Sequence, residues 1–149
     1  MDDEVRVLFT RLHPDAKAPI QGSSLAAGWD LKTVETCVIN KGKSTKVPTG
    51  LAVAIPAGYE GQIRARSSLG ARGIILPNGI GTIDADYRGQ IHVLMTWIGE
   101  GDSTIIEAGE RIAQMVISPI PKVKFEEVSE EQLGETERGD GGFGSTGRY

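Results

Sequence analysis

The segment RGDGGFGSTGRY, from Arg138 to Tyr149, combines residue types that suit a phosphate group and a nucleobase. Its glycines allow successive backbone N–H groups to converge on an anion, and Ser145 and Thr146 add hydroxyl donors. The guanidinium of Arg138 matches phosphate oxygens, and the ring of Phe143 offers a flat face for a base. The segment therefore predicts nucleotide binding, and a disordered Gly-rich tail is the competing interpretation.

A second block, NGIGTIDADYRG, runs from Asn78 to Gly89 and contains two closely spaced carboxylates. On a strand, Asp84 and Asp86 would share one face, and Tyr87 would project to the other unless the chain turns there. A carboxylate at this place could hold and deprotonate a water molecule. Taken alone, however, the block favours a hairpin whose Asp and Gly residues serve only turn geometry.

A third block, RARSSLG, places one arginine beside two hydroxyl groups. Arg66 precedes Ser67 and Ser68, and a guanidinium with neighbouring hydroxyls suits phosphate oxygens. Because small clusters of arginine and serine are common on protein surfaces, this block predicts a phosphate site only in combination with the others.

The fourth block, GERIAQM, has the pattern of a turn that enters a strand. Strand alternation predicts Arg111, Ala113 and Met115 on one face. Ile112 and Gln114 would then lie on the other face. An inward-facing Gln114 would need a polar partner, because burial of an unpaired amide is costly.

Composition describes an ordinary globular chain of 149 residues, 39% apolar and 24% charged, which fits one domain. Only 5% of the residues are aromatic, so we expect a thin core and self-association. The net charge of -4 argues against a broad nucleic-acid surface. The single cysteine, Cys37, excludes an internal disulfide and is expected at a buried strand position. The acidic start, without a signal-peptide pattern, and the lack of a membrane-length apolar run predict a cytoplasmic protein.

Short segments rich in Val, Ile, Leu and Thr recur between turn residues, and predict an all-β sandwich, barrel or jelly roll. Strands are expected at Val5–Leu12, Thr33–Ile39, Thr45–Ile55, Gly61–Arg66, Ile74–Leu76, Thr82–Ile83, Gln90–Ile98, Thr104–Ile106, Arg111–Ile117 and Val123–Val128. Pro77-Asn78-Gly79 predicts a hairpin turn. Ser129–Leu133 predicts one helical turn, with Ser129 and Gln132 as its capping pair. We expect a β domain over residues 1–133 and a loosely attached arm over 134–149.

Together with AGWDL, these blocks occur in an order that resembles the trimeric deoxyuridine triphosphate nucleotidohydrolases, the dUTPases. The five motifs are AGWDL, ARSSLG, GTIDADYRG, GERIAQ and RGDGGFGSTG, and they span residues 27 to 147. The resemblance implies a jelly-roll-like subunit, a homotrimer with active sites at subunit interfaces, and an arm that closes over another subunit's site. It implies hydrolysis of dUTP to dUMP and pyrophosphate, by water attack on the α-phosphorus with Mg²⁺ on the triphosphate. This reaction would limit uracil in DNA and supply dUMP for thymidylate synthesis.

The resemblance also implies roles for single residues. Asp84 matches the carboxylate that orients the attacking water, and Tyr87 the ring that packs against the deoxyribose. Asp30 is a candidate for the Mg²⁺ water shell or for a structural role, and Arg111 suits an interface salt bridge. The implied substrate-binding residues are Arg66, Ser67, Ser68, Asn78, Gly79, Gly81, Thr82, Ile83, Tyr87, Gln114, Arg138, Phe143, Gly144, Ser145 and Thr146. The implied partners are dUTP and further copies of the chain, without nucleic acid or membrane.

Two other functions stay open at this point. Ser68 stands where these hydrolases commonly have glycine, and RSSLG is the spelling of dCTP deaminases, which share the fold. Those enzymes need a glutamate at the place of Leu94 and lack the arm motif, so hydrolysis is preferred over deamination, with residual dCTP activity left open. A catalytically silent dUTP-binding regulator is disfavoured because Asp84 is present. His13 and His92 match no motif.

Overall fold

The computed structural model describes residues 4–144 and 147–149, so the predicted contacts of Ser145 and Thr146 lie outside the described residues. The elements are β1 (Leu8–Arg11), β2 (Ile20–Gln21), β3 (Trp29–Lys32), β4 (Cys37–Asn40), β5 (Thr45–Pro48), β6 (Leu51–Ala54), β7 (Tyr59–Arg64), α1 (Ser67–Arg72), β8 (Ile74–Ile75), β9 (Gly81–Ile83), β10 (His92–Trp97), β11 (Ser103–Ile106), β12 (Arg111–Pro119) and the 3-10 helix η1 (Glu130–Leu133). Neither described helix is long and apolar enough to span a membrane.

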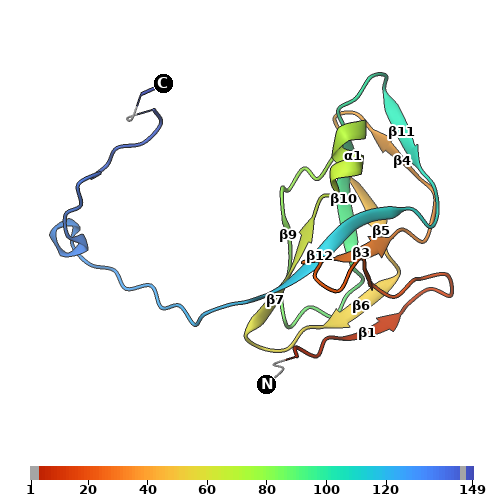
Figure 1. The fold of residues 1–149 in the computed structure, drawn as a ribbon, viewed down its shortest axis with the longest axis horizontal. Helices are drawn as coiled ribbons and strands as arrows, with labels where there is room; N and C mark the ends of the chain where they lie inside the picture. The colour runs from red at the N-terminus through yellow and green to blue at the C-terminus, as the bar shows by residue number, and fades with distance from the viewer. Residues whose placement is uncertain (1–3, 145–146) are drawn as a thin grey trace.

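Over residues 4–144 and 147–149, the strands form four antiparallel sheets around one core (Figure 1). The largest sheet has the order β2-β3-β12-β7-β9, and the others are β5-β10-β8, β4-β11 and β1-β6. Alternation along the strands fills the core: in β4, Cys37 and Ile39 are buried while Val38 between them is exposed. The predicted all-β, jelly-roll-like class is therefore confirmed.

Cys37 occupies the buried strand position that the sequence predicted. Its burial, with a further contribution from the nearby carboxylate of Glu35, raises the pKa of the thiol above its ordinary value. A thiol that stays protonated is a poor nucleophile, so Cys37 acts here as a small packing residue.

Several strand boundaries differ from the prediction. The single strand expected over Thr45–Ile55 is divided into β5 and β6, which pair with β10 and β1 respectively. The chain turns a corner between them, where Gly50 has φ +70° and leaves no space for a Cβ beside Val34 and Ala16. The Thr49 hydroxyl secures this corner by donating to the carbonyl of Ile91 at 2.7 Å.

The segment expected as a strand over Thr33–Ile39 begins to pair only at Cys37. The Thr33 hydroxyl donates to the carbonyl of Glu35 at 2.8 Å, and this local bond holds a turn in place of a strand start. Strand β3, immediately before it, was not predicted.

The Asn-Gly turn is present but does not join a hairpin. The Gly79 N–H donates to the Leu76 carbonyl at 2.9 Å, with Gly79 at φ +72°. The flanking strands pair elsewhere, β8 with β10 and β9 with β7. The predicted hairpin is therefore wrong in its pairing, and the turn carries the chain from one sheet to another.

Beyond β12 the chain leaves the compact body as an extended arm (Figure 1). The Ile120 N–H still donates to the Gly58 carbonyl at 2.8 Å. The strand expected at Val123–Val128 is wrong, since this segment has no strand assignment and Phe125 is 96% exposed. The predicted helical turn is confirmed as η1, where the Ser129 N–H donates to Gln132 Oε1 at 3.0 Å.

Candidate active site

Three of the five motifs, AGWDL, ARSSLG and GERIAQ, meet at one shallow hollow of about 270 Å³. It is lined by Asp30, Arg66, Ser67, Ser68 and Gln114. The central strands of the large sheet explain this meeting, because β12 lies between β3 and β7 and Gln114 faces Asp30 across the β3–β12 register. Directly paired residues of antiparallel strands share one face of the sheet. The sheet therefore places an amide, a carboxylate and the Arg-Ser-Ser segment together.

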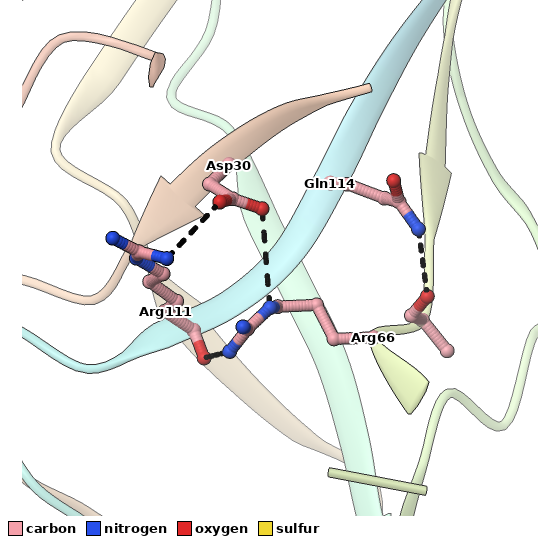
Figure 2. Close-up of polar contacts among 5 residues, drawn as sticks. Asp30, Arg66, Arg111 and Gln114 are labelled. Carbon is pink, nitrogen blue, oxygen red and sulfur yellow. Dashed lines mark hydrogen bonds and ion pairs between the residues drawn. The ribbon is translucent and has the colours of Figure 1, made fainter. Parts of the chain in front are cut away.

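An ion-pair network links two arginines through one carboxylate in this hollow (Figure 2). Asp30 Oδ1 lies 3.9 Å from Arg66 Nε, and Asp30 Oδ2 lies 3.6 Å from Arg111 Nη1. Arg66 also donates through Nη1 to the carbonyl of Arg111 at 3.1 Å. Two guanidiniums against one carboxylate leave the cluster with excess positive charge, which favours an anionic ligand.

Gln114 has the polar partner that its position requires. Its Nε2 donates to the carbonyl of Ala65 at 3.2 Å, just before the Arg-Ser-Ser segment (Figure 2). Gly28, in the first motif, leaves room for this amide, because a Cβ there would lie 2.4 Å from Gln114 Oε1. The glycine thus lets the backbone approach the side chain closely.

The predicted alternation along the GERIAQM segment is wrong at its start. The register shifts between Arg111 and Ala113, so Ile112 and Ala113 are both buried while Arg111 is exposed. Such a bulge places two consecutive residues against one on the partner strand. Arg111 is thereby turned toward Asp30, away from the core.

The two serines lie at the start of α1, a helix that the sequence analysis did not predict. Leu69 is its buried residue, and the helix ends at Gly73, whose φ of +104° is left-handed. Ser67 and Ser68 are exposed at the hollow. Their hydroxyls are therefore accessible to a ligand bound beside Arg66.

A second hollow, of about 260 Å³, surrounds the predicted catalytic residue. Its lining residues are Lys46, Thr82, Ile83, Asp84, Tyr87, Gln90, His92 and Leu94. Strand β9 ends at Ile83 and the chain then turns, with the Tyr87 N–H donating to the Asp84 carbonyl at 3.1 Å. Asp84 and Asp86 consequently do not share a strand face, and the turn interpretation of this block holds. Within the described residues, the Asp84 carboxylate is exposed and has no side-chain hydrogen bond or ion pair.

Tyr87 is held against the backbone of its own loop. Its hydroxyl donates to the Gln90 carbonyl at 2.8 Å. A Cβ at Gly89 would lie 2.4 Å from the Tyr87 hydroxyl, so any residue other than glycine at this position would displace the tyrosine ring. Gly81 likewise lies close to Ile63 and to Asn78 Nδ2, with distances of 3.2 and 3.4 Å from an ideal Cβ. The loop therefore holds the Tyr87 ring in a defined position.

The predicted site residues thus form separate groups in one chain. The two hollows have no lining residue in common among the described residues. Arg138, Phe143 and Gly144 line neither hollow, and the end of the chain to which they belong extends away from the compact body (Figure 1). Gly28, Gly89, Lys46 and the pair of Arg72 and Glu110, 3.7 Å apart, were missed as site residues. For Gly28, Gly89 and Glu110 the signal was present, since all three stand inside the quoted motifs.

The arginine–serine cluster on one part of the β fold is suited to an anionic ligand, and the accessible carboxylate beside a tyrosine on another part is a candidate general base. The family model for dUTPase matches residues 14–147, and the chain belongs to the dUTPase family. The resemblance inferred from the motifs is therefore confirmed.

Named relatives agree with this assignment over nearly the whole chain. The deoxyuridine 5'-triphosphate nucleotidohydrolase of Syntrophotalea carbinolica is 45% identical, covering 96% of this chain and 97% of the relative. That of Hydrogenobaculum sp. is 46% identical, covering 96% and 99%.

Among solved structures, a mutant dUTPase of Staphylococcus bacteriophage 80alpha with dUpNHpp has a TM-score of 0.82 and 29% identity, covering 96% of this chain and 99% of that chain. A mutant dUTPase of the S. aureus phage phi11, whose structure describes a structural Mg(II) ion, shares the fold with a TM-score of 0.75. It is 23% identical and covers 84% of this chain and 97% of its own.

The contact between Gly28 and Gln114 predicts an effect of a single methyl group. Gly28→Ala should displace the Gln114 amide from the Ala65 carbonyl and lower the free energy of unfolding by about 1–3 kcal/mol through overpacking. Urea denaturation measures this change. Gly22→Ala is the matched control, because a Cβ there meets nothing within 4 Å. Equal stability of the two variants would contradict the proposed close approach.

Proposed function

We propose that this chain hydrolyses dUTP to dUMP and pyrophosphate, with Asp84 orienting the attacking water. The observation that carries the proposal is the accessible carboxylate of Asp84, held beside Tyr87 at the end of β9. Membership of the dUTPase family and the named relatives support the substrate. The complex of the phage 80alpha enzyme with dUpNHpp supports binding of the uncleaved nucleotide.

In the proposed reaction, a water oxygen attacks the α-phosphorus and the bond from that phosphorus to the bridging oxygen breaks. Asp84 accepts the proton of the water, and pyrophosphate leaves. Arg66, the hydroxyls of Ser67 and Ser68 and the Gln114 amide are proposed to bind the triphosphate. The positive charge of Arg66 is proposed to stabilise the negative charge that develops during phosphoryl transfer, whereas the hydroxyl and amide donors bind the phosphates throughout the reaction.

Base and sugar selection is proposed for the loop between β8 and β9 and for Tyr87. The Asn78 amide and the backbone of Gly79, Gly81, Thr82 and Ile83 would pair with the uracil edge. A site built to pair with uracil rejects cytosine, because its own groups would be left unpaired. The Tyr87 ring, fixed by Gly89, would pack against the deoxyribose and leave no space for a 2′-hydroxyl.

Mg²⁺ is proposed to arrive bound to the triphosphate of the substrate. Both oxygens of Asp30 face guanidinium groups, which repel a divalent cation. Over the described parts of the chain, no group of three or more His, Cys, Asp or Glu residues is placed to hold a metal. Mg²⁺ commonly keeps several waters and binds through substrate phosphates. Asp30 therefore fits a structural role, with contact to the ion only through water.

We propose that the active form is a homotrimer in which the two hollows of different copies face each other. Within the described chain the two hollows share no lining residue, and a second copy is proposed to bring its Asp84 to the arginine cluster of the first. The exposed apolar residues Val123 and Phe125 support contact with another copy. Residues 134–149, the end of the extended arm that begins beyond β12, would then close over a site through Arg138 and Phe143.

The cellular role proposed for the reaction is to keep uracil out of DNA and to supply dUMP for thymidylate synthesis in the cytoplasm. Deamination of dCTP has less support. The position that would need a glutamate is Leu94, which lines the same hollow as Asp84. An apolar side chain there cannot move a proton.

The first test is a pyrophosphate-release assay with Mg²⁺ and five nucleotides: dUTP, dCTP, dTTP, dATP and UTP. We expect rapid release from dUTP and little from the others, because the loop pairs with uracil and Tyr87 excludes the 2′-hydroxyl. Ammonia release from dCTP would support the deaminase instead. Equal turnover of UTP and dUTP would contradict the role of Tyr87.

The second test is Asp84→Asn, which keeps the size of the side chain and removes its basicity. We expect dUTP affinity to persist while kcat falls by about 10²–10⁴-fold, because the water is no longer deprotonated. Calorimetry with dUpNHpp and steady-state kinetics measure the two quantities. Asp86→Asn, two residues away in the same turn, is the matched control and should stay close to wild type. Near-normal kcat in Asp84→Asn would exclude this mechanism.

The third test concerns the arm. A chain truncated after Glu137 should remain folded with an unchanged oligomeric state but lose most activity, because Arg138 and Phe143 no longer reach the nucleotide. Light scattering, circular dichroism and the pyrophosphate assay check the three properties. Phe143→Ala isolates base stacking within the intact arm and should give a smaller loss. Full activity of the truncated chain would show that the arm has no part in catalysis.

A further inference from the structure

One carboxylate beside the site has no explained role. Glu110 Oε2 is the buried side-chain oxygen that has no hydrogen-bond partner among the described residues. Its cationic neighbour is Arg72, whose Nη1 lies 3.7 Å away. Burial of a carboxylate oxygen is costly unless a cation or donor compensates. The distance allows charge compensation but is too long for a hydrogen bond.

The backbone of Glu110 is firmly placed in the frame of the site. Its N–H donates to the Glu107 carbonyl at 3.1 Å, and its own carbonyl accepts from the Thr33 N–H at 3.0 Å. Thr33 directly follows β3, the strand of Asp30, and Arg111 directly follows Glu110 at the start of β12. Glu110 therefore moves with the strands that hold the ion-pair network.

Arg72, in contrast, belongs to the element that presents the two hydroxyls. It is the last residue of α1, and Ser67 and Ser68 are the first two. The helix has one buried residue, Leu69, which is 5% exposed. A helix of this length needs tertiary contacts to hold its orientation. Two side-chain contacts join the region of α1 to the start of β12. Just before the helix, Arg66 donates to the Arg111 carbonyl, and at its last residue Arg72 faces Glu110.

We propose that Arg72 and Glu110 are positioning residues, whose ion pair sets the orientation of α1 relative to β3 and β12. The pair would thereby place the Ser67 and Ser68 hydroxyls at the distance from Arg66 that a phosphate requires. Its effect on catalysis rests on the proposed function, whereas its effect on the helix does not.

The expected kinetic signature is a change in KM for dUTP. The serine hydroxyls would contact the phosphates in the ground state and in the transition state alike. Loss of such uniform binding raises KM and leaves kcat almost unchanged. Removal of a merely stabilising ion pair would lower the melting temperature without this change in KM.

The experiment uses the charge reversals Arg72→Glu and Glu110→Arg and the double variant that exchanges the two residues. Both single variants should raise KM about five-fold, the size expected for a partly exposed ion pair, and the double variant should restore most of the loss. If the two residues acted only by attracting the anionic nucleotide, Glu110→Arg would lower KM, because this substitution adds positive charge. A rise in both singles therefore separates positioning from attraction. Lys43→Glu and Glu100→Arg, both at exposed turn positions, are controls with the same charge changes.

Hydrogen exchange of the α1 amides, measured without nucleotide, gives an independent readout. We expect faster exchange at Gly70–Arg72 in both single variants and recovery in the double variant. If the wild-type protein did not hydrolyse dUTP, the proposed function would be wrong. Hydrogen exchange would still test whether the Arg72–Glu110 ion pair orients α1. Unchanged KM and exchange in both singles, or a double variant that recovers neither, would overturn the inference. Arg72→Lys and Glu110→Gln replace the reversals if those do not fold.

Discussion

The contact on which the site depends is the carboxylate of Asp30 between the guanidiniums of Arg66 and Arg111. Two cations this close repel each other unless an anion lies between them. The order of β3, β12 and β7 in the large sheet supplies that anion, since it brings Asp30 across from Gln114 and next to the chain that leaves β7. The cluster can then hold its shape before a phosphate arrives, so less ordering is needed on binding.

Much of the fold could be predicted because the core strands carry a local signal. In β4, burial alternates from Cys37 to Ile39, as the sequence pattern indicates. Strand β3 has the same alternation, since Asp30 and Lys32 follow Trp29 and Leu31 in turn, and it was overlooked in the sequence. At Val123–Val128 the composition favours a strand, but the segment forms none. A strand needs a neighbouring strand to pair with, and the described residues of the single chain provide none there. Local pattern therefore predicts strand propensity better than pairing.

The site could be predicted by residue type but not by arrangement. Arg66, Ser67 and Gln114 were identified from motifs, and they do line one hollow. The bulge before Ala113, the turn after Ile83 and the fit of Gln114 over Gly28 depend on contacts between distant segments. The contact between Arg72 and Glu110 was missed for the same reason, because nothing in the sequence indicates that the end of a short helix lies against the turn before β12.

The separation of the two hollows has a consequence for how such a protein tolerates damage. If each working centre takes its cationic part from one copy and its acidic part from another, then chains disabled in different parts can complement one another in a mixed assembly. Conversely, a chain with a defect in one of the two parts would inactivate the centres that it shares with unmodified copies. In such an assembly, dilution would also separate the two parts of each centre, so the activity per chain would fall with protein concentration.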